Sequence, residues 1–128
     1  MENQSKLILV IEDDVALLEL IVSKLHLKGY QTAVGRSVEQ ATACMADNEK
    51  IDAIWLDHFL LGSESGLDLL ARIKNSEKWK NIPIFLVSNV ASSDQIEMYK
   101  KYGIKKYFSK VDYNLDEIVV DIDSTLKS

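Results

Sequence analysis

The fold class of this chain follows from one stretch, Leu7–Asp14, which reads LILVIEDD. Five apolar residues in a row are followed at once by three acidic ones. A strand without a polar face must be covered on both sides, as in a parallel sheet with helices on each face. Similar short apolar runs lie downstream at 31–35, 51–56, 82–87 and 105–109. We therefore predict five strands, each buried between two helical layers.

The segments between these runs repeat apolar residues every three or four positions, as amphipathic helices do. In the first segment we predict an inward face of Val15, Leu18, Val22 and Leu25, with Gly29 ending the helix. Three later helix starts follow from residue pairs with capping-box spacing: Ser37 with Gln40, Ser92 with Gln95, and Asn114 with Glu117. Alternating strands and helices predict an α/β fold with a doubly wound, five-stranded parallel sheet and helices on both faces.

Composition limits the function classes. The 128 residues carry 15 Lys and Arg against 20 Asp and Glu, a formal net charge of −5, which argues against direct nucleic-acid binding. Cys44 is the single cysteine, so an intramolecular disulfide and a thiolate metal cluster are excluded. The apolar run 7–11 is too short for a signal-peptide core or a membrane span. We expect a single cytoplasmic domain over 1–128, with its core at about 6–127 and no membrane contact.

Polar residues follow the predicted strands, at the edge where ligands bind to sheets of this type. They include Glu12, Asp13, Asp57, Ser88 and Lys110. Two carboxylates about 4 Å apart repel by roughly 4 kcal/mol at an effective dielectric near 20, so the three acids require a cation, a proton or a lysine. Mg²⁺ is the best candidate, because it takes oxygen ligands from one or two carboxylates and keeps positions for phosphate.

The same residues suit the transfer of a phosphoryl group to Asp57. The transferred group has three equatorial oxygens, and a metal, an ammonium group and a hydroxyl donor together would stabilise their charge. Lys110 and Ser88 supply the ammonium and the hydroxyl. Asp57 would be the nucleophile, and its product would be an acyl phosphate.

With these motifs, the chain resembles the receiver domains of two-component response regulators, from Lys6 to Lys127. The resemblance implies the strand order 2-1-3-4-5. It also implies that Glu12 and Asp13 bind Mg²⁺, that Asp57 accepts the phosphoryl group and that the backbone carbonyl of Phe59 joins the metal ligands. Ser88 and Tyr107 match the positions of the family's switch residues.

This resemblance implies a signalling switch that takes its phosphoryl group from a histidine kinase or a histidine phosphotransfer protein. Phosphorylation would draw the Ser88 hydroxyl toward the phosphate and let Tyr107 turn inward. A downstream protein would read the surface formed by the fourth helix, the fifth strand and the last helix. A homodimer linked to phosphorylation is a further assembly that the resemblance allows. We expect the chain to catalyse only its own phosphorylation and slow dephosphorylation. We also expect no output domain in this chain, which would be either a stand-alone receiver or a part of something longer.

Four features depart from the family pattern. Leu61 stands where a Pro is frequent, and the loop 62–66 is one residue longer. Asn89 replaces a small residue and is expected to narrow access to Asp57. Val111 replaces a Pro, so the preceding peptide is expected to be trans.

Other interpretations remain open. The departures favour a pseudo-receiver that binds partners without phosphorylation. A haloacid dehalogenase-type phosphatase would need a D-x-D pattern that 12–15 lacks, and a flavodoxin-like module would not place acids near a flavin phosphate. Asp14 suits a helix N-cap, His58 a loop position beside the pocket, and Tyr107 could simply pack in its strand.

Overall fold

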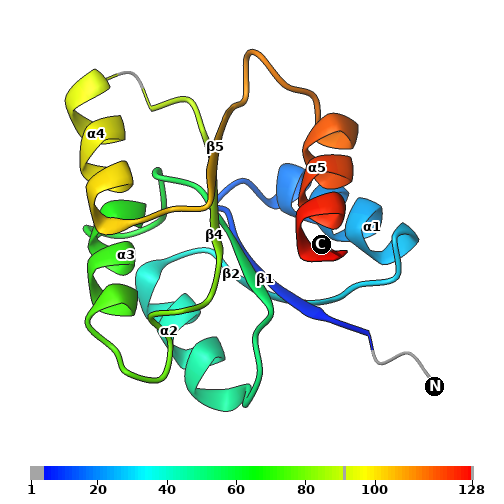
Figure 1. The fold of residues 1–128 in the computed structure, drawn as a ribbon, viewed down its shortest axis with the longest axis horizontal. Coiled ribbons are helices and arrows are strands. Elements are labelled where there is room, and N and C mark those ends of the chain that lie inside the picture. Colours follow the sequence, from blue (N-terminus) through cyan, green and yellow to red (C-terminus); the bar gives the residue numbers. More distant parts are fainter. Residues whose placement is uncertain (1–4, 91, 128) are drawn as a thin grey trace.

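Ten elements alternate strand and helix in the computed structural model, which describes residues 5–90 and 92–127 (Figure 1). The predicted domain limits at 1 and 128 lie outside the described residues. Among those that are described, no helix is long and apolar enough to cross a membrane. The elements are β1 (Leu7–Ile11), α1 (Val15–Leu27), β2 (Gln31–Gly35), α2 (Val38–Asp47), β3 (Ala53–Leu56), α3 (Gly66–Lys74), β4 (Ile84–Ser88), α4 (Ser93–Tyr102), β5 (Lys106–Ser109) and α5 (Leu115–Lys127).

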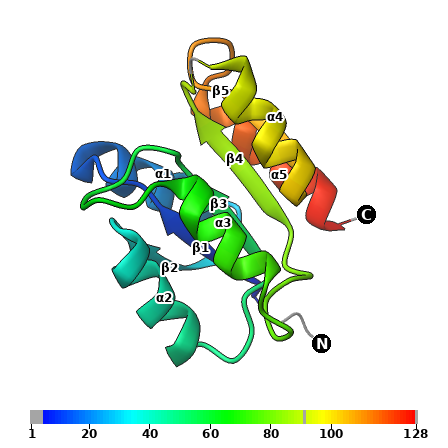
Figure 2. The same cartoon turned by 90° about the vertical axis from the view of Figure 1, so that its left-hand side faces the viewer.

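The five strands form one sheet in the order β2-β1-β3-β4-β5, and every pair is parallel. The predicted fold class and strand order are thereby confirmed. Helices α1 and α5 cover one face, and α2, α3 and α4 cover the other (Figures 1 and 2). Alternate residues of β1 illustrate the two-sided burial, because Val10 packs toward α1 and α5 whereas Leu9 and Ile11 pack toward the other layer.

Three strands begin later than predicted, and the smallest difference is in β5, which starts at Lys106 rather than at 105. In β3 the ladder starts at Ala53, because the Asp52 side chain accepts the hydrogen bond from the Leu7 N–H at 2.8 Å in place of a backbone carbonyl. In β4 the ladder starts at Ile84, because Pro83 has no N–H to donate and contributes only its carbonyl, which accepts from Ile54 N.

The inward face of α1 also differs from the prediction. Leu18, Ile21 and Leu25 are buried, whereas Val15 is 47% exposed. Val15 is the first residue of the helix, directly after the N-cap. The buried face of the helix instead includes Ile21, one helical turn from Leu18 and from Leu25.

The predicted helix caps are present, with one change of partner. Asp14 caps α1 by accepting from Leu17 N, and Asn114 and Glu117 form a reciprocal capping box at α5. Ser37 caps α2 by accepting from Gln40 N, but the Gln40 side chain accepts from Arg36 N rather than from Ser37 N. Gly103 ends α4 with a φ of +107°.

Candidate functional site

The carboxyl ends of neighbouring parallel strands bring the predicted polar residues together. Glu12 follows β1, Asp57 follows β3, and Ser88 ends β4, and the order of the sheet makes these three strands direct neighbours. Glu12, Asp57 and Ser88 are each at most 2% exposed. Lys110 follows β5, the next strand along the sheet.

Both carboxylate oxygens of Asp57 accept hydrogen bonds, one from Ser88 and one from Lys110, the two donors predicted from the sequence. The Ser88 hydroxyl donates to Oδ1 at 2.5 Å, and the Lys110 ammonium donates to Oδ2 at 2.8 Å. The backbone N–H of Phe59 also donates to Oδ1, at 3.3 Å. The Asp57 carboxylate is therefore held in one orientation by hydrogen-bond donors from three different segments.

Glu12 shares the Lys110 ammonium, whose Nζ lies 2.9 Å from Glu12 Oε1. The pKa of Glu12 is raised to about 7, chiefly by burial and also by the negative charge of Asp57, whereas the hydrogen bond from Lys110 lowers it. Burial alone would lower the pKa of Lys110, but its bonds to Asp57 and Glu12 outweigh this and raise it. Lys110 therefore stays charged while Glu12 can hold a proton near neutral pH.

Three carboxylates are close enough to bind one cation. One oxygen from each of Glu12, Asp13 and Asp57 lies within 4.8 Å of the others. The Lys110 ammonium binds two of these acids, Glu12 and Asp57, and its one positive charge does not balance three carboxylates, so a divalent cation would be stabilised there. All the side-chain donors are hard carboxylate oxygens, the type that Mg²⁺ prefers, so the residues fit the predicted ion.

His58, predicted as a loop residue beside the pocket, is buried and connects three elements. Its Nδ1 lies 2.6 Å from the Tyr99 hydroxyl of α4, and its backbone N–H lies 3.4 Å from Ser88 Oγ. Its carbonyl accepts from the N–H of Gly66, the first residue of α3, where an added Cβ would come within 2.8 Å of the Tyr99 hydroxyl. Burial lowers the pKa of His58 and raises that of Tyr99, so both rings are neutral.

Tyr99 is the residue of this region that the sequence interpretation missed. It is fully buried, although it lies on a helix whose other side chains are mostly polar or exposed. An aromatic residue inside an amphipathic helix gives no sign of its partner, and the only available signal was the histidine directly after Asp57.

Tyr107 lies beside Ser88. Its ring is half-buried, and its hydroxyl donates to the Ser88 carbonyl at 3.2 Å. Tyr107 thus contacts the backbone of Ser88, the residue whose hydroxyl donates to Asp57. Its role in switching stays a prediction, as does the metal contact of the Phe59 carbonyl.

Two departures from the family pattern depend on each other. The N–H of Val111 donates to the Asn89 side-chain oxygen at 3.2 Å, a bond that a Pro at position 111 could not make. Asn89 is exposed, and this bond turns its side chain toward the loop after β5. The peptide between Lys110 and Val111 is trans, as predicted.

Comparison with known proteins agrees with this geometry. Residues 8–123 match the family described as the response regulator receiver domain, and the chain belongs to this family. The phosphate regulon transcriptional regulatory protein PhoB of Pseudomonas aeruginosa is 30% identical over 122 residues, which cover 95% of this chain. The chain spans only 52% of the length of that relative.

Two further matches have nearly the same length as this chain. The polar-differentiation response regulator DivK of Brucella ovis is 27% identical over 106 residues, covering 83% of this chain and 85% of DivK. The crystal structure of a CheY-like response regulator receiver domain protein from Methanospirillum hungatei has a TM-score of 0.85 at 22% identity, covering 97% of this chain and 95% of that one. The structural match confirms the fold.

Proposed function

We propose that this receiver domain is a phosphorylation-dependent signalling switch, and that Asp57 accepts the phosphoryl group from a phosphohistidine of a sensor kinase or phosphotransfer protein. The observation that carries this proposal is the environment of Asp57. Its carboxylate is buried, accepts from Ser88 and Lys110, and lies within 4.8 Å of two further carboxylates that suit a divalent cation.

In the transfer, an Asp57 carboxylate oxygen attacks phosphorus, the new O–P bond forms, and the P–N bond to the donor histidine breaks. The electron pair of that bond returns to the imidazole, which takes up a proton. Glu12, Asp13, Asp57 and the Phe59 carbonyl would hold Mg²⁺, which supplies positive charge to the phosphoryl oxygens when bound. Lys110 supplies a second positive charge, and the Ser88 hydroxyl donates a hydrogen bond.

The switch would begin with Ser88, which donates to Asp57 and would move its hydrogen bond to a phosphoryl oxygen. Ser88 also contacts the His58 N–H and, through its carbonyl, the Tyr107 hydroxyl. A shift of Ser88 would therefore reach β5 through Tyr107 and α4 through His58 and Tyr99. The surface of α4, β5 and α5 would then differ between the two states, and a downstream protein or a second copy would bind one of them better.

The proposal also includes the catalytic activity and the location of the protein. The protein would catalyse only its own phosphorylation by the kinase and the slow hydrolysis of the resulting acyl phosphate. Its cytoplasmic location, predicted from the sequence, belongs to this proposal too.

The test is an intact-mass measurement after incubation with acetyl phosphate and Mg²⁺. We expect one added phosphate on the wild type, none on Asp57→Asn, and none on the wild type when EDTA replaces Mg²⁺. An unmodified wild type would favour the pseudo-receiver interpretation instead. A modified Asp57→Asn variant would move the acceptor to another residue.

A further inference from the structure

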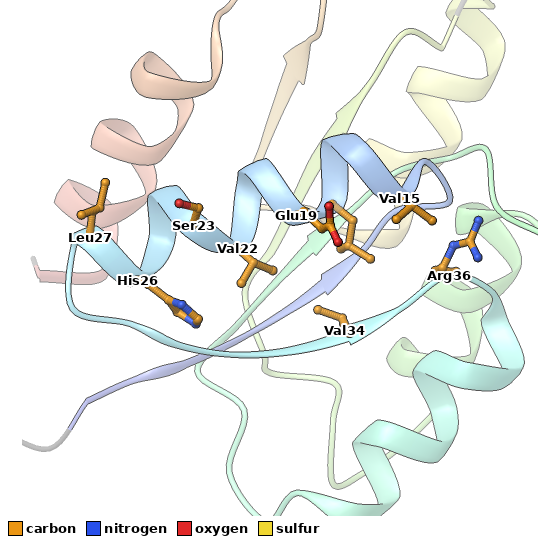
Figure 3. A pocket seen from close by; sticks show the side chains of 9 residues that line it. Val15, Glu19, Val22, Ser23, His26, Leu27, Val34 and Arg36 are labelled. Atoms are coloured by element: carbon orange, nitrogen blue, oxygen red, sulfur yellow. The ribbon is translucent and has the colours of Figure 1, made fainter.

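Arg36 holds the loop that carries Asp13. It follows β2 directly and is half-buried. Its Nε and one terminal nitrogen of its guanidinium group both donate to the backbone carbonyl of Asp13, at 2.9 and 2.7 Å. Figure 3 shows Arg36 beside Val15, at the end of an apolar groove of about 640 Å³ between α1 and β2. A planar guanidinium group that donates twice to one oxygen fixes both the distance and the direction of that carbonyl.

The backbone of Arg36 holds a second loop. Its carbonyl accepts from the Leu61 N–H at 2.9 Å, and Ser37 forms an isolated parallel bridge with Leu61. A Pro at position 61 would have no N–H for this bond, so the contact depends on the departure from the family pattern. Gly62 continues the loop with a φ of +88°, a conformation that favours glycine.

The two loops fastened by Arg36 are the ones that carry two proposed metal ligands. Asp13 lies in the loop after β1, and Phe59 lies in the loop after β3, two residues before Leu61. The other carboxylates of the site have a different anchor, because buried Glu12 and Asp57 both bind Lys110. Asp13 is only half-buried, and the bonds from Arg36 fix the backbone from which its side chain extends.

We propose that Arg36 is a positioning residue of the metal site, whose side chain sets the Mg²⁺ affinity by fixing the Asp13 loop before the ion binds. The bond from Leu61 N–H to the Arg36 carbonyl is made by the backbone and would persist with another residue at this position. This inference rests on the proposed function, because it requires that the three carboxylates bind Mg²⁺. Residues that orient metal ligands without touching the ion commonly change metal affinity when they are replaced.

The hydrogen bonds of Arg36 would strengthen Mg²⁺ binding, whereas its positive charge would weaken it. A guanidinium group near the acids repels a divalent cation, so its charge alone would weaken Mg²⁺ binding. Replacement by Lys keeps the charge and removes the planar fork, whereas replacement by Met removes both. The two variants therefore separate positioning from charge.

The experiment is a calorimetric Mg²⁺ titration of the wild type, Arg36→Lys and Arg36→Met. Arg72→Lys is the matched control, because Arg72 is exposed on α3 and pairs with Glu64. We expect Arg36→Lys to weaken Mg²⁺ binding about tenfold, the lower end of the range for residues that orient metal ligands, and Arg72→Lys to leave it unchanged. Arg36→Met should also weaken binding.

A second readout uses the metal-free protein. We expect the Asp14 and Val15 amides to exchange with solvent several-fold faster in Arg36→Lys than in the wild type, with thermal unfolding showing that both are folded. Wild-type affinity in Arg36→Lys, tighter binding in Arg36→Met, or unchanged exchange would each overturn the inference. A wild type that does not bind Mg²⁺ at all would instead contradict the proposed function, whatever the Arg36 variants do.

Discussion

Glu12 is a buried acid whose ionisation the fold opposes. Its pKa is raised from an ordinary value of 4.5 to about 7, first by burial and then by the charge of Asp57. Between these two pH values the folded protein holds a proton that the unfolded chain has released. The contribution of Glu12 to stability therefore falls as the pH rises from 4.5 through 7.

This linkage predicts how Glu12→Gln behaves without metal. Gln cannot ionise, so the variant escapes the cost of charging a buried acid. In EDTA, we expect the free energy of unfolding of Glu12→Gln to gain on that of the wild type by on the order of 2 kcal/mol between pH 5 and pH 8. Urea unfolding at several pH values measures this gap. A gap that stays constant or shrinks with rising pH would show that Glu12 is ionised at an ordinary pKa.

The bond between His58 and Tyr99 makes a second prediction at a single atom. Tyr99→Phe removes one hydroxyl and leaves His58 Nδ1 buried without that partner, which should cost about 1–3 kcal/mol of unfolding free energy. Tyr102→Phe is the control, because Tyr102 lies on the same helix and is 41% exposed. Equal effects of the two substitutions in urea unfolding would mean that the buried bond contributes nothing to stability.

Adjacent acids serve different purposes where β1 meets α1. Asp14 caps α1 through Leu17 N, whereas the Asp13 carboxylate faces Glu12 and Asp57. We expect Asp14→Ala to lower the unfolding free energy by about 1 kcal/mol and to keep Mg²⁺-dependent phosphorylation. Asp13→Asn should keep the stability and lose most of the phosphorylation by acetyl phosphate. If Asp14→Ala also abolished phosphorylation, or Asp13→Asn did not, the division of roles would be wrong.

The elements that build the site could be predicted because they obey simple periodicity. Continuous apolar runs without polar alternation indicate strands that are covered on both faces, and parallel strands end at one edge of the sheet. Asp57, Ser88 and Lys110 each follow or end such a run, so their meeting could be expected without knowledge of any contact.

Other features could not be predicted, because they depend on side chains that meet across layers or loops. The Asp52 side chain replaces a backbone carbonyl and delays the start of β3. His58 and Tyr99 lie 41 positions apart in the chain, and no local pattern marks them as partners. Arg36 likewise reads as one more charged residue until its contact with the Asp13 carbonyl is seen.

At the scale of the whole molecule, the site joins the two helical layers. Lys110 precedes α5, on one face of the sheet, and Tyr99 of α4 reaches His58 from the other face. A phosphoryl group on Asp57 carries roughly two negative charges at neutral pH and replaces the single charge of the carboxylate, so this junction would gain about one negative charge. Because Ser88, His58 and Lys110 all contact Asp57 or its neighbours, both layers would respond to one modification.

The most direct measurement identifies the modified carboxylate. Acetyl phosphate-treated protein is reduced with borodeuteride, which converts an acyl phosphate to an alcohol, and the peptides are sequenced by mass spectrometry. We expect deuterated homoserine at position 57 and unmodified Glu12 and Asp13. Label at Glu12 or Asp13, or at no carboxylate in a protein that binds Mg²⁺, would contradict the assignment of Asp57 as the phosphoryl acceptor.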